Sequence, residues 1–249
     1  MFKVWIASAL LSASLLAGEI SVAVAANLSD VIEVFKAEFA KSNPQTKVNT
    51  VLGASGKFTT QIKNGAPFDL FLSADMGFPE VLYADKIAVS KPVVYASGAL
   101  AMMSTRGFDL SKGMSVLDDV KVDKIALANP KTAPYGTATL EAFKNAKLFE
   151  KVQAKLVYGE SISQAIQFAT TAADIGFVNK SAFFGETMKR YQEGKDWVEV
   201  DPKLYTPIAQ GMVLLQQAKN NAEARAFYDF VLSPQAKKIF KDYGYFVHE

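Results

Sequence analysis

The chain has 249 residues, half of them hydrophobic, with 27 basic and 25 acidic residues and a net charge of +2. This near balance, without a dense run of Lys or Arg, argues against a nucleic acid or an anionic membrane as a partner. The chain has no cysteine and a single histidine, His248, which excludes disulfides, thiol chemistry and a lipidated N-terminal cysteine. The same scarcity argues against a transition-metal site built from nitrogen or sulfur ligands.

The first residues have the features of a secretory signal. Lys3 supplies a positive start, Val4 to Leu16 is apolar and small, and Ala17 fits the cleavage position. The apolar run is too short and too early for a membrane span. We therefore expect residues 1–17 to be a cleaved signal peptide and the remainder to be an exported, soluble protein.

Short β-branched runs alternate with helical patterns along the rest of the chain. The first run, Glu19 to Ala25, leads into a helix with Asn27 as the predicted N-cap, and Val48 to Leu52 leads into a helix capped by Ser55. Pro79 is predicted at the first position of a short helix. Further strands are predicted at 68–74, 99–103, 124–128, 155–158, 175–178, 197–200 and 211–216, and helices at 181–191 and twice near the end, the last from Ser233-Pro234. This alternation predicts mostly parallel sheets covered by helices.

Four strand-to-helix junctions are candidates for one ligand site: Ala26-Asn27, Ala54-Ser55, Pro134-Tyr135-Gly136 and Ser161-Ile162. The first N–H groups of a helix lack internal partners and carry the positive end of its dipole, so they can hold an anion without a charged side chain. Ligands of open α/β sheets lie beyond the carboxyl ends of strands, where such junctions occur. Two junctions precede the strand at 99–103 and two follow it, which indicates two lobes sharing a cleft.

Several catalytic interpretations fail on spacing. The stretch Gly53-Ala54-Ser55-Gly56-Lys57 has too few residues between its glycines for a nucleotide-binding loop, and Lys57 stands where a serine-hydrolase elbow needs glycine. Asp69 and Asp75 flank an apolar strand, and we interpret them as turn and cap residues. Ser161 can be explained as a helix cap. Since His248 is the only histidine, we find no nucleophile–base pair and predict no enzyme activity.

The mature chain resembles the periplasmic molybdate-binding proteins of ABC transporters. The resemblance is carried by AVAANLSDVIEVF, VLGASGKFTTQIKNGAPFDLFLSAD, IALANPKTAPYGTATLEAF, GESISQAI, DIGFVNKSA and FYDFVLSPQAKKIFKDYGYF. It implies the two-lobed type II periplasmic-binding-protein fold, an α/β architecture in which each lobe is a mostly parallel sheet flanked by helices and the ligand cleft lies between the lobes. We assign residues 18–98 and 207–249 to lobe I and residues 99–206 to lobe II.

The resemblance also implies a function and a site. The protein would capture molybdate, and tungstate with it, in the periplasm and deliver the ion as a monomer to a transmembrane ABC permease, without a cofactor or a metal cation. Carried over by motif, the oxyanion donors are Ala26, Asn27, Ser55, Tyr135 and Ile162, the last through its backbone N–H. Many family members have Ser in place of Asn27 and Tyr in place of Asn179. Asn179 and Ser161 are further candidates.

A site made only of donors suits a fully deprotonated tetrahedral dianion. Hydrogen phosphate would bring a proton with no acceptor, at a cost of about 1–3 kcal/mol, and sulfate differs only in size. Molybdate and tungstate are nearly the same size, so the sequence does not rank them. The alternatives are a protein of the same fold that binds sulfate, phosphate or a small organic acid, an exported hydrolase, and a ligand sensor that partners a membrane receptor.

Overall fold

The computed structural model describes residues 18–247, so the predicted signal peptide, 1–17, and His248 lie outside the described residues. The first of its two five-stranded sheets has the strand order β2-β1-β3-β10-β4. These strands span Thr46–Gly53, Gly18–Ala25, Leu70–Leu72, Ile208–Leu214 and Val93–Gly98. β1 is parallel to β2 and β3, whereas β10 is antiparallel to both β3 and β4, so four strands share one direction.

The second sheet repeats this plan with the order β7-β6-β8-β5-β9. Its strands span Leu156–Gly159, Ile125–Ala128, Ile175–Asn179, Leu100–Met103 and Trp197–Glu199. Here β5 is the strand that runs against the others, since it is antiparallel to β8 and β9 while β6 is parallel to β7 and β8. Both sheets are therefore mostly parallel, as predicted.

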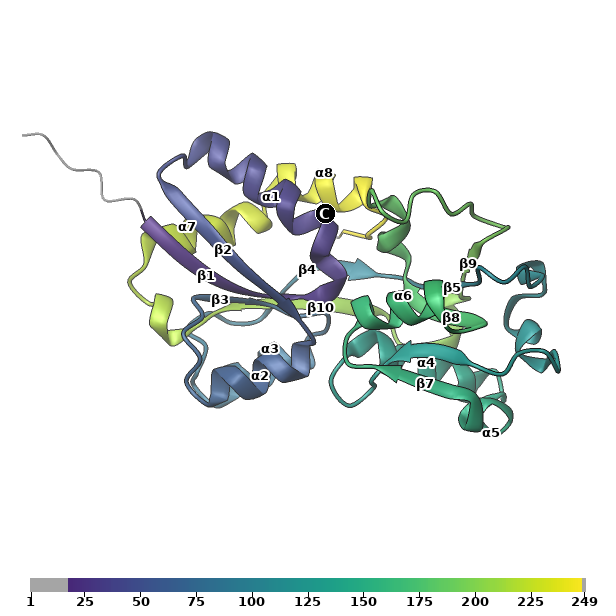
Figure 1. Cartoon of the computed structure of the whole chain (residues 1–249). Coiled ribbons are helices and arrows are strands. Elements are labelled where there is room, and N and C mark those ends of the chain that lie inside the picture. The colour runs from purple at the N-terminus through teal and green to yellow at the C-terminus, as the bar shows by residue number, and fades with distance from the viewer. Residues whose placement is uncertain (1–17, 248–249) are drawn as a thin grey trace, which may run out of the picture.

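Helices cover both faces of each sheet (Figure 1). Around the first sheet they are α1 Ser29–Ser42, α2 Ser55–Lys63, α3 Gly77–Ala84, α7 Ala222–Val231 and α8 Pro234–Asp242. Around the second they are α4 Pro134–Asn145, α5 Phe149–Val152 and α6 Ile162–Thr171. We use lobe I and lobe II for the halves built on the first and second sheets, and we keep the bounds given above as a proposal.

Separate apolar cores lie on the two faces of the first sheet. On one face, Phe35 of α1 packs edge-on against Phe240 of α8, with ring centroids 4.8 Å apart. On the other face, Phe58 of α2 meets Phe71 of β3. Such edge-to-face aromatic pairs add to the burial of apolar area. The cores fix α1 and α2 on opposite sides of β1, which aligns their first residues at one end of the sheet.

The two lobes are joined where β4 runs into β5 and where the chain returns to β10 (Figure 1). They also touch away from these connections. The N–H of Gly56 in lobe I donates to the Thr132 carbonyl of lobe II at 2.9 Å, and Lys57 forms an ion pair with Glu160 at 2.8 Å. The two halves are thus closed against each other.

Local differences from the sequence-based expectations have physical causes. The predicted helix at 181–191 is a short 3₁₀ turn, Lys180–Phe184, that stops where Gly185 becomes extended. A Cβ at Gly185 would lie 2.3 Å from the Asp30 carboxyl carbon, so the close approach of lobe I fixes this bend. The helix of Pro79 begins two residues earlier, at Gly77, because the Asp75 carboxylate accepts the N–H of Phe78. The N-cap position itself is Met76, so Asp75 supports the helix start from one residue before the cap.

Candidate functional site

A small cavity lies between the lobes at the four junctions. Its volume is about 10 Å³, and its lining residues are Ala25, Ala26, Asn27, Gly53, Ala54, Ser55, Ala74, Ala133, Pro134, Tyr135 and Ile162. All five predicted donors line this one cavity, which we call the anion pocket. Its volume is close to the space that one water molecule needs, so the lobes would have to part slightly to admit an ion.

Ser55 contributes the start of α2 to the pocket. It is the first residue of the helix, and the flanking residue is Ala54, so the predicted N-cap is displaced by one position. Its Oγ accepts the backbone N–H of Ala74 at 3.0 Å, which uses an acceptor position and leaves the hydroxyl proton for another partner. The side chain is buried and lines the pocket, so this proton is available to a group placed there.

The start of α4 offers a single backbone donor. Pro134 at the first helical position has no N–H, and Gly136 donates to the Ala133 carbonyl at 2.8 Å. This leaves the N–H of Tyr135 as the available donor of the first turn. The conformation is fixed by sequence, because a Cβ at Gly136 would lie 2.1 Å from the Ala128 carbonyl oxygen.

The start of α6 is capped as predicted. Ser161 Oγ accepts the N–H of Gln164 at 3.4 Å, and Ile162 is the first helical residue. Ser161 is absent from the pocket lining, whereas Ile162 is part of it. The first-turn N–H of Ile162 is therefore placed at the pocket, while the Ser161 hydroxyl is used within its own helix.

Asn27 has a different role from the predicted N-cap. It lies inside a 3₁₀ turn, Ala26–Leu28, and α1 begins at Ser29 without a side-chain cap. The Asn27 amide nitrogen donates instead to Gln210 Oε1 at 2.9 Å and to the Tyr245 hydroxyl at 3.0 Å. Both side-chain hydrogens are used behind the pocket, so its backbone N–H is the group left for an anion.

The Tyr135 hydroxyl lies against Gln210 and Gly98, and the bond from Gln210 uses one of its acceptor positions. It accepts from Gln210 Nε2 at 3.3 Å, and a Cβ at Gly98 would lie 2.0 Å from it. The Tyr135 ring thus packs under the junction of β4 and β5. Burial raises the pKa of this hydroxyl well above 10, so it stays neutral.

Asn179 supports the pocket from lobe II. Its amide nitrogen donates to Ser181 Oγ at 2.7 Å and to the Asn27 carbonyl at 3.4 Å. It is absent from the pocket lining, and its Oδ1 is buried without a hydrogen-bond partner in the described chain. The residue therefore contacts the turn of Asn27 instead of the pocket itself.

Two residues that bond to the side chains around the pocket, Gln210 and Tyr245, were not predicted from the sequence. Gln210 lies on β10, fully buried, and Tyr245 follows α8. A glutamine inside the apolar run of β10 is the feature that could have indicated the first, because a buried amide requires partners. Tyr245 lies too far along the chain from any junction to be linked to one by pattern.

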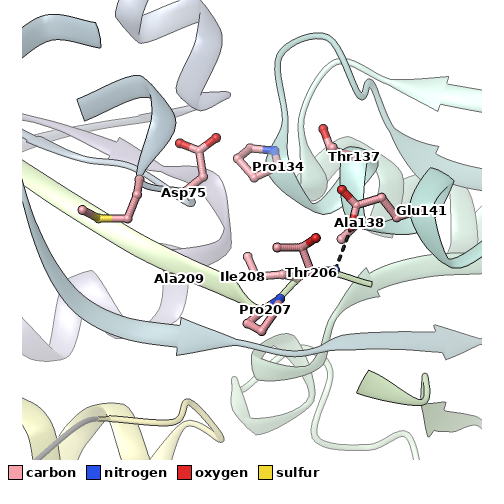
Figure 2. Close-up of a pocket in the computed structure, with 10 residues that line it drawn as sticks. Asp75, Pro134, Thr137, Ala138, Glu141, Thr206, Pro207, Ile208 and Ala209 are labelled. Atoms are coloured by element: carbon pink, nitrogen blue, oxygen red, sulfur yellow. Dashed lines mark hydrogen bonds between the residues drawn. The ribbon is translucent and has the colours of Figure 1, made fainter. Parts of the chain in front are cut away.

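A larger cavity lies between the lobes beside β10 (Figure 2). Its volume is about 360 Å³, and its walls carry two carboxylates, Asp75 of lobe I and Glu141 of lobe II. Burial raises the pKa of Asp75, and Glu141 accepts the N–H of Thr206 at 2.7 Å. Carboxylates repel an anion, so this cavity is unsuited to an oxyanion despite its size.

The described residues offer neither a metal centre nor a membrane span. Within 18–247, no group of three His, Asp or Glu side chains is arranged to hold a metal ion. No helix in this part of the chain has the length and apolar character required to cross a bilayer. What the site does contain is a set of uncharged N–H and O–H donors at helix starts.

Two lobes closed over a small pocket at which helix starts converge are the architecture of a protein that captures a solute. The family model described as bacterial extracellular solute-binding protein matches residues 20–246. The chain belongs to this family, and it is a binding protein instead of an enzyme.

The chain is also similar to individual solute-binding proteins over nearly its whole length. The chain is 38% identical to the molybdate-binding protein ModA of Rhodobacter capsulatus, over 92% of this chain and 88% of the relative. It is 37% identical to ModA of Azotobacter vinelandii, over 95% and 93%. The solved periplasmic molybdate-binding protein of Azotobacter vinelandii superposes with a TM-score of 0.84 at 29% identity, over 92% of this chain and 100% of that one. The expected two-lobed periplasmic-binding-protein fold is confirmed.

Proposed function

We propose that the protein binds molybdate, and tungstate with similar affinity, in the periplasm and delivers the ion as a monomer to an ABC permease. The observation that carries the proposal is the anion pocket, where the first residues of α2, α4, α6 and the turn before α1 meet. The similarity to two molybdate-binding proteins over nearly the whole chain supports the choice of ion.

The donors that we assign to the ion are nearly all backbone groups. They are the N–H groups of Ala26, Asn27, Ser55, Tyr135 and Ile162, together with the Ser55 hydroxyl. Hydrogen bonds to a charged acceptor contribute about 1.5–3 kcal/mol each, and donors already fixed on helix starts lose little entropy on binding. A group of such donors can offset the dehydration of a dianion without a cationic side chain.

Selectivity follows from the same donor set. Molybdate and tungstate carry no proton at neutral pH, so every oxygen can accept. Hydrogen phosphate would place a proton against donors, and one buried polar group would be left unpaired at about 1–3 kcal/mol. Sulfate is excluded only by the fit of a smaller ion.

Binding would involve motion of the lobes. Donors from lobe I and lobe II surround the pocket, so an ion contacts both sets only when the lobes are closed. The ion would therefore bind the closed form more tightly and shift the population toward it. The closed form would be the species that a permease recognises.

The test is isothermal titration with molybdate, tungstate, sulfate and phosphate, for the wild type and Ser55→Ala. We expect one site per chain for the first two ions and little or no heat from the others. Ser55→Ala should weaken molybdate binding about 10- to 100-fold, because it removes a hydroxyl donor to a charged ligand.

Ser161→Ala is the matched control, since it deletes a hydroxyl from the neighbouring helix start without touching the pocket. It should reduce stability by about 1 kcal/mol through loss of the cap and leave the affinity for molybdate nearly unchanged. A wild-type protein that binds neither molybdate nor tungstate but binds another solute would contradict the proposal.

A further inference from the structure

The hydroxyl of Tyr245 is the centre of a buried junction between the lobes. It donates to the Asn27 carbonyl at 2.8 Å and accepts from Asn27 Nδ2 at 3.0 Å and from Ser181 Oγ at 2.9 Å. A phenol has one proton and two acceptor positions, so all of its hydrogen-bonding capacity is used. Tyr245 is 3% exposed, which makes each of these bonds costly to lose.

These bonds connect the pocket wall to the opposite lobe. Asn27 forms part of the pocket wall in lobe I, whereas Ser181 belongs to the 3₁₀ turn that follows β8 in lobe II. Two of the three bonds hold the main chain and side chain of Asn27, and so set where its N–H points. The third bond requires lobe II to be in place, so it links the position of that N–H to closure.

The segment that carries Tyr245 is itself held firmly. Ser97 of β4 and Phe246 exchange two backbone hydrogen bonds, at 2.7 and 2.9 Å, and the N–H of Tyr245 donates to the Phe240 carbonyl at 3.0 Å. Gly244 has a positive φ of 74°, and a Cβ there would lie 2.5 Å from the Phe184 ring of lobe II. Both features favour glycine at this position. The chain end is thus built into the contact between the lobes beside the pocket.

We propose that Tyr245 is a positioning residue for the anion pocket, which holds the Asn27 turn in its donating orientation and couples it to lobe II through Ser181. The proposal rests on the proposed oxyanion function. Tyr245 does not touch the pocket, so it acts through Asn27. Its hydroxyl determines how tightly the closed form retains the ion and not whether lobe I folds.

The test compares Tyr245→Phe with Tyr228→Phe in molybdate titrations and stopped-flow dissociation. Tyr228 is a matched control, because it is also a buried tyrosine of lobe I, 5% exposed, with its hydroxyl bonded to Ser90 away from Asn27. The ring of Tyr245 keeps its edge contact with Phe240 in the variant. We expect Tyr245→Phe to lower molybdate affinity about tenfold, chiefly by faster dissociation, and Tyr228→Phe to change it less than about twofold.

A second variant separates positioning from stability. Ser181→Ala removes the lobe II end of the junction together with the bond that Ser181 Oγ accepts from Asn179, and we expect about a threefold loss of affinity with a smaller drop in melting temperature than in Tyr245→Phe. The double variant Tyr245→Phe, Ser181→Ala should lose less than the sum of the single effects, because both remove the same bond. If Tyr245→Phe does not fold, the Ser181→Ala titration decides alone.

The outcomes distinguish a failure of the role proposed for Tyr245 from a failure of the proposed oxyanion function. A wild type that binds molybdate while Tyr245→Phe behaves like Tyr228→Phe, or while Ser181→Ala binds like the wild type, overturns the role of Tyr245 and leaves the oxyanion function standing. A wild type that does not bind molybdate or tungstate overturns both. Equal losses of melting temperature in the two tyrosine variants, with affinity lost only in Tyr245→Phe, support positioning over general stability.

Discussion

The two cavities between the lobes differ in volume and in the charge of the side chains that line them. The larger one has about 36 times the volume of the smaller, at 360 Å³ against 10 Å³, but it carries the carboxylates of Asp75 and Glu141. The anion pocket has no charged side chain in its wall and is surrounded by helix starts. Volume alone would favour the cavity with two carboxylates, whereas the chemistry of the lining groups favours the anion pocket that we propose.

The sharpest test of this contrast adds a negative charge to each cavity in turn. Ser55→Asp places a carboxylate in the anion pocket, where repulsion of a dianion at about 4 Å amounts to several kcal/mol. Aspartate is favourable in the first turn of a helix, and circular dichroism of the variant checks that the fold is retained. We expect no measurable molybdate binding by titration calorimetry.

Thr137→Asp is the counterpart for the larger cavity, whose wall includes this exposed residue. Its molybdate affinity should stay within about twofold of the wild type, because a charge exposed to water is screened. Equal losses in Ser55→Asp and Thr137→Asp would show that the two cavities had been assigned wrongly.

A smaller effect is expected from steric pressure on the contact behind the pocket. In Gly98→Ala the new Cβ would lie 2.0 Å from the Tyr135 hydroxyl and 2.7 Å from Gln210 Nε2. The start of α4 must shift to relieve this clash, and the Tyr135 N–H shifts with it. We expect about a tenfold loss of molybdate affinity, since a misplaced donor loses much of its hydrogen bond.

Two further variants check this explanation. Adding Tyr135→Phe to Gly98→Ala removes the oxygen that the methyl group meets and should restore part of the affinity. Gly77→Ala should bind like the wild type, because only the Asp75 carboxylate lies within 4 Å of its added Cβ, at 3.9 Å. An affinity for Gly98→Ala equal to that of Gly77→Ala would show that the contact behind the pocket tolerates a methyl group.

The smallest expected effect comes from the ion pair at the surface of the cleft. Lys57 and Glu160 join the lobes at 2.8 Å, but their side chains are 49% and 72% exposed, so the pair contributes only about 0–1 kcal/mol. Lys57→Ala should weaken molybdate binding about twofold at low salt. The difference should vanish near 0.5 M salt, roughly, where exposed charges are screened.

Lys63→Ala provides the comparison for this pair, because Lys63 pairs with Asp85 at 2.7 Å entirely within lobe I. It should leave the affinity unchanged at every salt concentration. Similar salt dependence in the Lys57 and Lys63 variants would indicate a general charge effect instead of a link between the lobes.

The sequence was sufficient for most strands and helices and for the four junctions that surround the pocket, but not for β4 or for the 3₁₀ turn found where a helix was predicted at 181–191. β-branched runs followed by small and capping residues identify each junction, and the topology of parallel strands brings such junctions together. Ala26, Ser55, Tyr135 and Ile162 were found in this way. The local pattern places each of these residues at a junction, and the topology of parallel strands predicts that the junctions lie together.

The orientation of side chains was not accessible in the same way. The Asn27 amide satisfies Gln210 and Tyr245, which are 183 and 218 residues away in sequence, instead of capping α1. The Tyr135 hydroxyl likewise meets Gln210 on β10. Such long-range bonds between buried polar groups depend on the packed structure, so local sequence propensity does not predict them.

The composition of the pocket wall has a consequence for its response to acidity. Among the lining residues of the described chain, Tyr135 is the sole ionisable one, and burial keeps its hydroxyl protonated far into the alkaline range. The cage therefore has no protein group to titrate between mildly acidic and mildly basic conditions. Retention of the ion should follow a level profile there, altered only where the oxyanion itself takes up a proton.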